Sequence, residues 1–324
     1  MQTADISVRR LELFQTAAST GSVQAAAAES GLSVSTVSHH LRKLEEQLGT
    51  SLLDHSRRPM VLTPAGAVFL KYSAEALRLI RKAQAEATGG SLTGTRHLRL
   101  GLIEDFDSDI APELAVALAD AMPGCGFSHH TRVSHEILEL LRSRKLDLGL
   151  AAQPAAVPAG LREMPLLRDP FVLAVPAESA LPPEDFLSGA APEPFLRYSP
   201  QQIIAGQIEA QLRRLKVALP QRFEIESNQT MMAMIAAGSG WAVTTPLCYV
   251  RARRFHGKVR LNPFPGKGFA RYLSLFAAEE CPEAAARLVE ASLRNLISLR
   301  ALQPAHSAMP WLQDMFRLLD DDPR

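Results

Sequence analysis

The sequence predicts an α/β protein that begins with an all-α winged helix-turn-helix and continues into a two-lobed domain. Three observations support this fold class. Residues 33–49 have the apolar spacing of a helix with one buried side, and residues 64–90 continue as one long amphipathic helix. From residue 97 onward, strand patterns alternate with helix patterns. At 324 residues the chain exceeds what one core usually supports, so we expect several domains.

The first informative element is an early helix that starts at Ser7 and ends near Gly21. Arg9 and Arg10 lie in its first turn, where the helix dipole disfavours cations. A nearby phosphate would reverse that penalty, so both are candidate DNA contacts, and two solvated arginines are the equally good alternative. A second, Ala-rich helix is capped by Ser22 and ends at Ser30-Gly31.

Three residues join this Ala-rich helix to the helix over 33–49, as a helix-turn-helix requires. Ser33 is a favourable N-cap for the second of these helices, and Gly49 suits its C-terminal end. Opposite the apolar stripe, the first two turns carry short polar side chains and no acid. A helix that enters the DNA major groove needs such side chains near its N-terminus. The predicted DNA contacts on this helix are Ser33, Ser35, Thr36, Ser38, His39 and Arg42.

Residues 51–63 predict a wing, formed by two short strands around a basic turn. The tip of this wing would carry His55, Arg57 and Arg58 toward the sugar-phosphate backbone. Residues 1–62 contain six basic and six acidic side chains, and the whole chain has a net charge of +1. Affinity for DNA must therefore come from local placement of charges and from pairing of two copies.

From Leu11 to Gly66 the chain resembles the winged helix-turn-helix of the LysR-type transcriptional regulators. It departs from the family pattern at Val34, where Gln is frequent, at Leu53, where Phe is common, and at His55, where Arg is common. The resemblance implies a dimeric regulator that binds double-stranded DNA through residues 1–63. The matching residues are Leu11, Phe14, Ala17-Ala18, Gly21-Ser22, Ala25-Ala26, Leu32-Ser33, Val37-Ser38, Leu41, Leu44-Glu45, Leu48-Gly49, Leu52, Arg58 and Leu62-Thr63-Pro64-Ala65-Gly66.

Residues 64–92 are expected to form a linker helix, with Thr63-Pro64 as its start and a Gly-rich joint at 88–91. A helix of this length cannot bury an apolar stripe against the small N-terminal domain alone, so we expect a second copy of the chain to cover it. The resemblance implies the same homodimer, and a tetramer stays open. The alternative is packing on the C-terminal domain of the same chain. The stripe consists of Val68, Phe69, Tyr72, Ala76, Leu79, Ile80 and Ala83.

Residues 93–303 are expected to form a regulatory domain with two α/β lobes. Repeated strand-helix-strand patterns predict a parallel sheet in lobe I, at about 96–168 and 270–303. The chain leaves within 161–176 for lobe II, at about 169–269, and returns near 270. The resemblance, which covers residues 96–300 less specifically, implies a periplasmic-binding-protein-like effector domain.

A small-molecule effector is expected between the lobes, because ligands of such sheets bind beyond the strand ends, near helix N-termini. Since Glu104 and Asp105 would repel a carboxylate, we infer a ligand with amine or hydroxyl donors, or an anion held by Arg197 and the helix ends of lobe II. Asp107 and Asp109 more simply cap the helix that follows them. The predicted effector contacts are Glu104, Asp105, Phe106, Arg197, Tyr198, Ser199, Asn228, Gln229, Thr230 and Thr244.

The sequence predicts neither an enzyme nor a bound cofactor or metal. It contains no Gly-x-Ser-x-Gly motif, no phosphate-binding glycine loop and no evident set of nucleophile, base and orienting residue. The histidines at 129, 130 and 135 lack partners at metal-ligand spacing. The cysteines at 125, 248 and 281 are too far apart for a metal knuckle, and we expect them to be small buried side chains.

No signal peptide or membrane-length apolar run is visible, so we expect a cytoplasmic protein without membrane contact. Residues 304–324 form a C-terminal extension, with a short amphipathic helix predicted from Pro310. Its apolar side should dock on its own chain; a contact between dimers is the alternative. RNA polymerase is a further candidate partner. The runner-up function is an α/β solute-binding or enzymatic protein with an appended helical domain.

Overall fold

The computed structural model describes residues 6–87 and 95–319. The chain forms two compact units that divide at Gly89-Gly90. No helix within the described residues is both long and apolar enough to cross a membrane.

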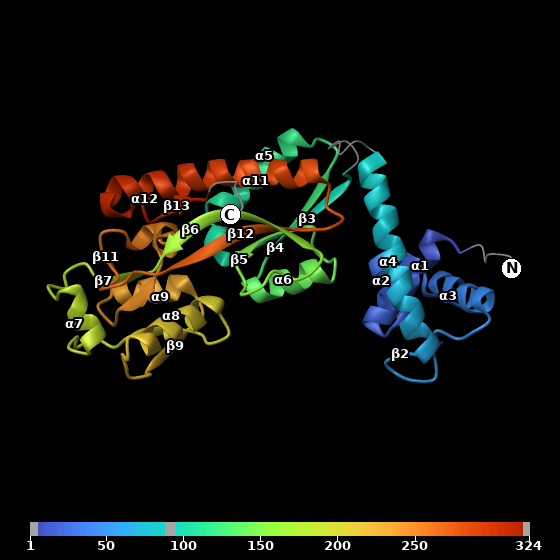
Figure 1. Ribbon diagram of the computed structural model, residues 1–324, viewed down its shortest axis with the longest axis horizontal. Coiled ribbons are helices and arrows are strands. Elements are labelled where there is room, and N and C mark those ends of the chain that lie inside the picture. The colour runs from blue at the N-terminus through green and yellow to red at the C-terminus, as the bar shows by residue number, and fades with distance from the viewer. Residues whose placement is uncertain (1–5, 88–94, 320–324) are drawn as a thin grey trace. The chain divides into compact units, whose positions relative to one another are not determined.

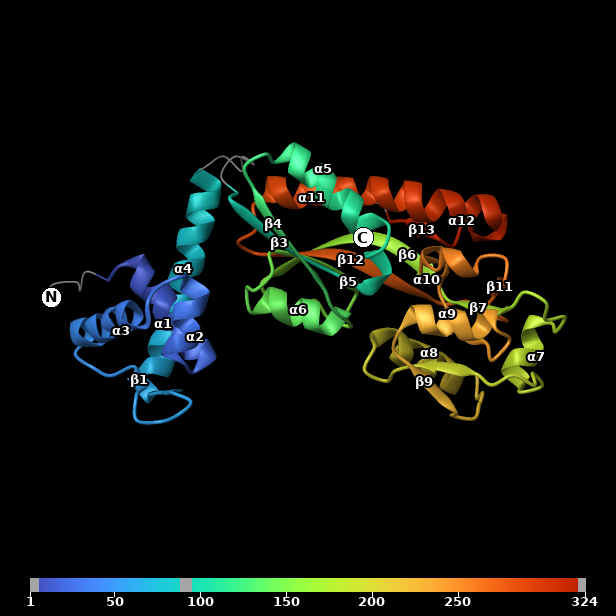
Figure 2. The ribbon, with the colours of Figure 1, turned by 180° about the vertical axis from the view of Figure 1, so that it is seen from behind.

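The N-terminal unit is the predicted winged helix-turn-helix (Figure 2). The Ser22 and Ser33 hydroxyls accept hydrogen bonds from the first turns of their helices, and Gly31 and Gly49 end those helices with positive φ, as expected. Phe14, Val37 and Leu44 are fully buried at the centre of its core. The elements are α1 (Val8–Thr20), α2 (Val23–Ser30), α3 (Val34–Leu48), the antiparallel strands β1 (Leu53–Asp54) and β2 (Val61–Leu62), and α4 (Pro64–Ala87).

One carboxylate of α3 holds the wing in place. Glu45 Oε1 accepts hydrogen bonds from the backbone N–H groups of Leu52 and Leu53, at 2.8 and 3.0 Å. Its other oxygen, Oε2, lies 3.1 Å from Nε2 of His55. Because these contacts join the last turn of α3 to the start of β1, Glu45 fixes how the wing follows α3. His55 therefore contacts α3 and stays exposed, and its predicted approach to DNA remains a prediction.

Helix α4 carries two apolar faces in place of the single predicted stripe. Phe69 packs against Phe14, with ring centroids 5.5 Å apart, and Leu77 is buried. Val68, Tyr72 and Leu79 are instead 60%, 63% and 51% exposed. Neighbouring helix positions point about 100° apart, so Val68 and Phe69 cannot both face α1. The exposed face is the part of the predicted stripe that this unit leaves uncovered; the side chain of Ala83 lies outside the described set.

Lobe I of the second unit is built on a six-stranded sheet with the order β13-β6-β12-β5-β3-β4. Strands β3, β4 and β5 are parallel, as predicted. Strand β12 runs antiparallel to β5 and β6, because it returns from lobe II while β6 leaves for it. The strands are β3 (His97–Leu102), β4 (Gly126–Thr131), β5 (Leu148–Ala152), β6 (Leu161–Pro170), β12 (Ala270–Ala278) and β13 (Arg317–Leu318).

Helices cover both faces of this sheet. Helices α5 (Ile110–Ala121) and α11 (Glu283–Ile297) lie on one face, and α6 (Ser134–Arg142) lies on the other (Figure 1). A short 3-10 helix, η2 (Glu104–Phe106), follows β3 and leads into α5. The carboxyl ends of the parallel strands therefore open next to η2 and the start of α6, where the sequence placed the ligand.

Lobe II contains an antiparallel sheet of order β10-β7-β11 and the parallel pair β8-β9. A bridge between Phe195 and Trp241 connects the pair to β10. The α/β character predicted for lobe II is confirmed, whereas α7, α10 and β11 were not expected from the sequence. The bounds are β7 (Val172–Pro176), α7 (Pro183–Ser188), β8 (Leu196–Tyr198), α8 (Ile203–Arg214), β9 (Phe223–Ile225), α9 (Asn228–Ala236), β10 (Ala242–Thr244), α10 (Pro246–Arg251), η3 (Arg253–Phe255) and β11 (Val259–Pro263).

The two crossings between the lobes lie side by side. Phe171 N donates a hydrogen bond to Phe269 O at 2.9 Å, and the two rings stack with centroids 4.2 Å apart. In the adjoining β6-β12 ladder, Asp169 is directly opposite Arg271. The crossings thus form one short double-stranded connection.

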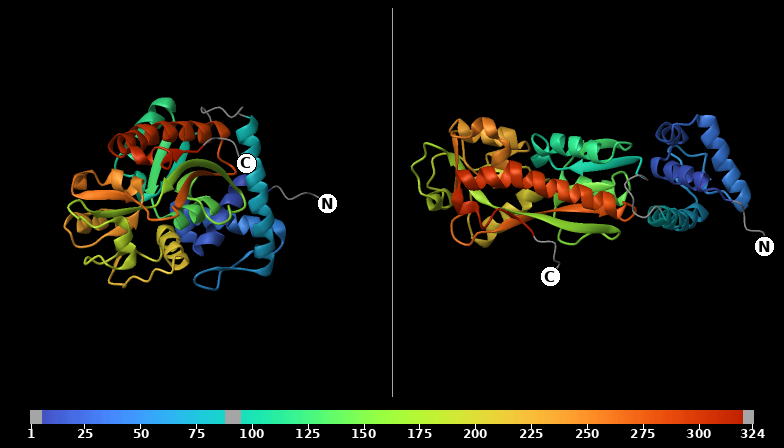
Figure 3. Two further views of the ribbon diagram at one scale, coloured as in Figure 1. Left: turned by 60° about the vertical axis from the view of Figure 1, so that its left-hand side comes forward. Right: turned by 90° about the horizontal axis from the view of Figure 1, so that it is seen from above.

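The C-terminal segment braces this unit. Helix α11 continues through a π-helical turn at Ser298–Leu302 into α12 (Gln303–Ala308), so that one helical rod spans both lobes (Figure 3). The helix predicted from Pro310 is wrong: a single 3-10 turn, Pro310–Leu312, precedes β13, which pairs with the edge strand β6. The free edge of β6 offers backbone partners that a surface helix would leave unused. Leu312 and Phe316 are buried, so the described part of the extension docks on its own chain, as expected.

We predict that Glu45→Ala loosens the wing, because two backbone N–H groups lose a charged acceptor. The opening free energy at Leu52 and Leu53 should fall by about 2 kcal/mol, so that their amide exchange accelerates by about 30-fold. Hydrogen exchange followed by mass spectrometry on peptides from residues 50–63 measures this. The exposed neighbour Glu46→Ala is the control, and equal exchange in both variants would contradict the role given to Glu45.

Candidate functional site

Helix α3 presents a polar N-terminal face. Ser33, Ser35, His39 and Arg42 are exposed, while Thr36 and Ser38 are partly covered. Ser33 Oγ lies 2.8 Å from Ser35 Oγ and 2.8 Å from Thr36 Oγ1. Ser33 Oγ thus bonds both neighbouring hydroxyls, while His39 and Arg42 are exposed further along the same helix.

The arginines predicted to contact phosphates differ in whether they already form hydrogen bonds or ion pairs within the protein. Arg10 Nη1 donates to Gln47 Oε1 at 2.7 Å, and Arg9 Nη2 donates to Ser30 O at 3.2 Å, so both arginines tie α1 to its neighbours. Arg57 pairs with Asp54. Arg58 is exposed at the wing and, within the part of the chain that the structure describes, makes no hydrogen bond or ion pair.

A cavity of about 390 Å³ lies between the two lobes. Lobe I lines it mainly with η2, the end of β4 and the start of α6; lobe II contributes the ends of β8 and β9 and the first turns of α8 and α9. The predicted effector residues that line it are Glu104, Asp105, Tyr198, Ser199 and Asn228. The structure therefore brings half of the predicted set together from positions more than ninety residues apart.

The other predicted effector residues lie elsewhere. Phe106 is buried in the core of lobe I. Arg197 is paired with Glu209 and donates to Leu219 O at 2.7 Å, away from the cavity lining. Gln229 and Thr230 follow the lining residue Asn228 on α9, and Thr244 lies behind Tyr198. Since Arg197 is engaged inside lobe II, the anion that the sequence assigned to it loses its main partner.

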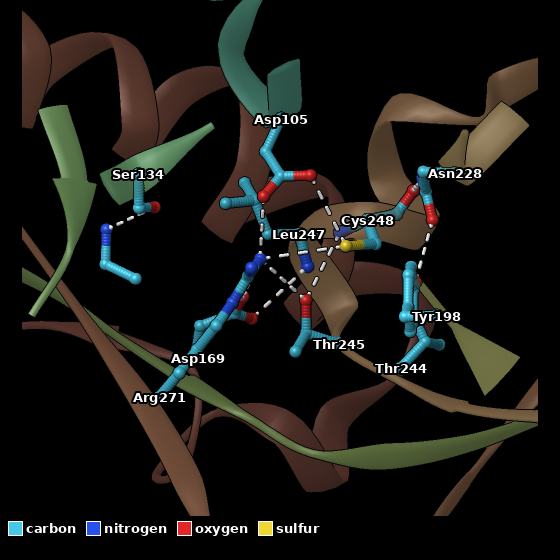
Figure 4. A network of polar contacts seen from close by, with 11 residues as sticks. Asp105, Ser134, Asp169, Tyr198, Asn228, Thr244, Thr245, Leu247, Cys248 and Arg271 are labelled. Atoms are coloured by element: carbon cyan, nitrogen blue, oxygen red, sulfur yellow. Dashed lines mark hydrogen bonds and ion pairs between the residues drawn. The ribbon is translucent and has the colours of Figure 1, made fainter. Parts of the chain in front are cut away.

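The floor of the cavity is a buried network around Arg271 (Figure 4). Its Nε donates to Asp169 Oδ2 at 2.8 Å, and its Nη2 donates to Asp105 Oδ2 at 2.9 Å and to Thr245 Oγ1 at 3.1 Å. Asp169 also accepts from Leu247 N at 3.3 Å. One guanidinium on a crossing strand thus contacts η2 of lobe I and the start of α10 in lobe II.

Burial and charge set the ionisation of this network. Burial opposes the charge of Arg271, but Asp105 and Asp169 outweigh it and raise the pKa of Arg271 well above the ordinary value. Burial also raises the pKa of Asp169, and the positive charge of Arg271 offsets only part of this rise. The guanidinium is therefore a permanent charge, and removing it would leave a carboxylate buried without its partner.

Tyr198 is fixed on the lobe II side of the cavity. Its hydroxyl donates to Asn228 Oδ1 at 3.0 Å and lies 2.7 Å from Thr244 Oγ1. Asn228 Nδ2 donates in turn to Cys248 O at 2.7 Å. Burial raises the pKa of Tyr198 well above its usual value, so the phenol stays neutral and acts through hydrogen bonds.

Further ion pairs join the lobes beside this network. Arg251 of α10 pairs with Glu104 at 2.8 Å, and Arg253 pairs with Asp109 at 3.3 Å. The helix-capping role expected for Asp107 and Asp109 is wrong: Asp109 occupies the N-cap position of α5 without a side-chain bond to it. Asp107 accepts a hydrogen bond from Thr131 Oγ1 at 2.6 Å. Asp107 and Asp109 thus bind side chains that are distant in the sequence, and these contacts replace the expected helix cap.

The cysteines carry neutral thiols. Cys248 and Cys281 are buried, as expected, and Cys125 is half-buried. Burial raises the pKa of both Cys248 and Cys281 to about 12, and it also raises the pKa of Cys125. Across the described residues, no group of three or more His, Cys, Asp or Glu side chains could hold a metal ion.

The sequence also pointed to Thr245, at the end of the strand that contains Thr244, but it missed Cys248 and Arg271 of the cavity lining and Asp169, which pairs with Arg271. The available signal was a charge inside an apolar strand: Arg271 opens the run over 270–278, and Asp169 interrupts the run over 166–175. A charged side chain at such a position predicts a buried partner of opposite charge.

Two family models match the chain. The one described as "LysR substrate binding domain" matches residues 93–296, and the one described as "Bacterial regulatory helix-turn-helix protein, lysR family" matches residues 8–67. Together they cover both units of the structure.

Individual relatives are similar to the chain in sequence, and solved structures share its fold. A "Probable hydrogen peroxide-inducible genes activator" of Mycobacterium avium is 32% identical over 166 residues, 51% of this chain and 53% of that protein, so this match spans about half of either length. The "DNA-binding transcriptional dual regulator OxyR" of Escherichia coli is 26% identical to this chain, and the match covers 79% of this chain and 84% of the length of that protein. A full-length OxyR variant from Pseudomonas aeruginosa has the same fold, with a TM-score of 0.68 at 20% identity over 90% of this chain and 96% of that chain.

We predict that the buried thiols resist modification in the folded protein. With a pKa of about 12, about one Cys248 thiol in ten thousand is ionised near pH 8, and the thiolate is the reactive form. Titration with a disulfide reagent should therefore detect at most one thiol in the native protein, from Cys125, and three after unfolding. Rapid native reaction of all three cysteines would contradict this assignment.

Proposed function

Because the chain belongs to the LysR-type family of transcriptional regulators, with its helix-turn-helix and its effector-binding domain, we propose that α3 reads operator DNA under the control of a small molecule in the inter-lobe cavity. The observation that carries the DNA-reading part is the division of α3 into two faces. Val37, Leu41 and Leu44 are buried, while the polar N-terminal face stays open. A helix anchored on one side and polar on the other can enter a major groove.

The effector part of the proposal rests on which elements line the cavity. Both lobes contribute to it, so a ligand that contacts both stabilises one arrangement of the lobes over another. The predicted contacts Glu104, Asp105, Tyr198, Ser199 and Asn228 remain the candidate ligand residues.

We infer that this chain responds to a bound molecule and not to oxidation of its cysteines. Relatives carry names that refer to hydrogen peroxide, and peroxide reacts with thiolates. The elevated pKa values of Cys248 and Cys281 keep both thiols protonated at neutral pH. A thiol in that state is a poor peroxide sensor.

The exposed face of α4 supports a homodimer. Val68, Tyr72 and Leu79 recur at helical spacing, and each is more than half exposed. A second copy of the same helix is the partner that covers such a face symmetrically.

The remaining partners follow from the role of a regulator. We place the protein in the cytoplasm, with operator DNA, and RNA polymerase is the partner through which an effect on transcription would pass. The runner-up, a solute-binding or enzymatic protein with a helical appendage, is disfavoured because the helix-turn-helix family model spans residues 8–67.

Substitutions on α3 and on the wing should affect DNA binding differently. We expect His39→Ala to reduce discrimination between the DNA upstream of its own gene and random DNA by roughly tenfold, because base contacts carry specificity. We expect Arg58→Ala to weaken both DNAs alike and to lower the salt slope by about 1, because phosphate contacts carry affinity. Fluorescence anisotropy over a range of salt concentrations measures both effects.

Matched controls make this test specific. Thr50→Ala changes an exposed residue beyond the end of α3, and Arg213→Ala removes an exposed arginine on α8. Both should bind as the wild type does. Unchanged sequence preference and affinity in His39→Ala would show that α3 is oriented differently on DNA.

The dimer is tested on α4. Tyr72→Glu places a charge in the exposed apolar face and should shift the mass measured by light scattering from two copies to one. Lys71→Glu, on the adjacent exposed position, should remain dimeric. A monomeric wild type, or equal dissociation of both variants, would remove α4 as the dimer contact.

A further inference from the structure

The walls of the inter-lobe cavity carry excess negative charge. The cavity and the side chains paired directly with its lining contain five carboxylates, those of Glu104, Asp105, Glu136, Asp169 and Glu226. The same set contains three guanidiniums, those of Arg132, Arg251 and Arg271. A ligand that enters this space therefore meets a field that attracts a cation.

The excess is located at two carboxylates. Glu104 is paired with Arg251, and Glu136 lies 3.9 Å from Arg132. Arg271 is shared between Asp105 and Asp169, so one positive charge serves two negative ones. Glu226 lines the cavity, and its carboxylate makes no hydrogen bond or ion pair with any described residue. Asp105 and Glu226 are thus the incompletely neutralised acids, one in each lobe.

Asp105 is also prepared to accept a further donor. Its side chain is only 11% exposed. One oxygen binds Arg271, and among the residues that the structure describes the other accepts a hydrogen bond only from the Cys248 thiol, at 3.4 Å. A thiol is a weak donor, so this second oxygen has capacity for a stronger one.

A second type of group at the same cavity favours an anion. Helices α6 and α8 begin there, one in each lobe, and neither is capped by a side chain. In the described part of the chain, no group accepts the N–H of Ser134, His135 or Glu136 in α6, nor that of Ile203 or Ile204 in α8. Helix α9, by contrast, is capped by Ser227. Open N–H groups and the positive end of the helix dipole suit a carboxylate.

We propose that the effector is a small zwitterion of the amino-acid type, with its ammonium group toward Asp105 and Glu226 and its carboxylate between the first turns of α6 and α8. This inference rests on the proposed effector role of the cavity, which supplies the site, while the charges supply the class of ligand. A volume of about 390 Å³ suits a single amino acid. Each charged end of the ligand contacts both lobes, so that binding draws the lobes into one arrangement.

The first experiment measures thermal unfolding of the full-length protein with each standard L-amino acid at millimolar concentration. For every amino acid that raises the melting temperature, the amine without its carboxylate and the carboxylic acid without its amine are tested on the same carbon skeleton. We expect at least one amino acid to stabilise the protein by several degrees and both of its halves to fail. No stabilising amino acid, or equal stabilisation by the deaminated acid, would overturn the proposal.

Variants at the two ends of the ligand supply a second readout. Glu226→Gln should weaken the active amino acid about fivefold by calorimetric titration, because one partly exposed charge pair is lost. Glu224→Gln changes an exposed carboxylate outside the cavity lining and should bind normally. Ile203→Pro removes one N–H at the first position of α8, where proline is tolerated, and should also weaken binding. Ile203→Val keeps that N–H and is its control. Normal binding to both Glu226→Gln and Ile203→Pro would refute the placement.

DNA binding separates this inference from the proposed function. If an amino acid binds as described but leaves DNA binding unchanged, the ligand class stands and the regulatory role of the cavity fails. If a sugar, a dicarboxylate or another non-zwitterion binds the cavity and changes DNA binding, the regulatory role stands and the ligand class fails.

Discussion

The buried contact between Arg271 and Asp169 is the constraint on which the second unit depends. The two residues face each other on the crossing strands, where charges are costly to bury unless they are paired and hydrogen-bonded. The same guanidinium reaches Asp105 in lobe I and Thr245 in lobe II. Removing one partner of such a pair typically costs about 3–5 kcal/mol, because the other is left charged and dry. The pair therefore specifies how the lobes meet, and with that the floor of the cavity.

This arrangement limits how the lobes can respond to a ligand. The crossings are joined by the Phe171–Phe269 contact, and the helical rod from α11 to α12 spans both lobes. A large hinge opening would break these contacts. A ligand ammonium at Asp105 acts more directly, because it shares a carboxylate that Arg271 already holds. The free energy of that exchange differs between lobe arrangements, and such a difference is what allows a ligand to shift a conformational equilibrium.

The sequence was sufficient where the determinants are local. The apolar spacing of α3, with Ser33 before it and Gly49 after it, predicts a helix whose buried and exposed faces the structure reproduces. The sequence was insufficient where a partner is distant. Asp169 and Arg271 are about a hundred positions apart, and nothing near either one indicates the other.

Distant partners also explain two wrong predictions. The sequence predicted that Arg197 in lobe II could bind a ligand, but Glu209 of the following helix, α8, forms an ion pair with it. The residues after Pro310 have helical spacing, yet Arg317 and Leu318 form strand β13, which pairs with the otherwise free edge of β6.

The engagement of basic residues within the N-terminal unit supports the proposal that two copies bind DNA together. Arg9, Arg10 and Arg57 all have partners in their own chain, so their approach to phosphates competes with internal contacts. In the proposed dimer a single copy would be weakly anchored, and specificity would depend on two recognition helices held about 34 Å apart, one turn of the duplex. A protein of this design has no need to alter α3 itself in order to regulate. In the proposed dimer a change in the spacing of the two helices would be enough, because a small error in that distance would remove the second set of contacts while the first would be too weak to hold the complex.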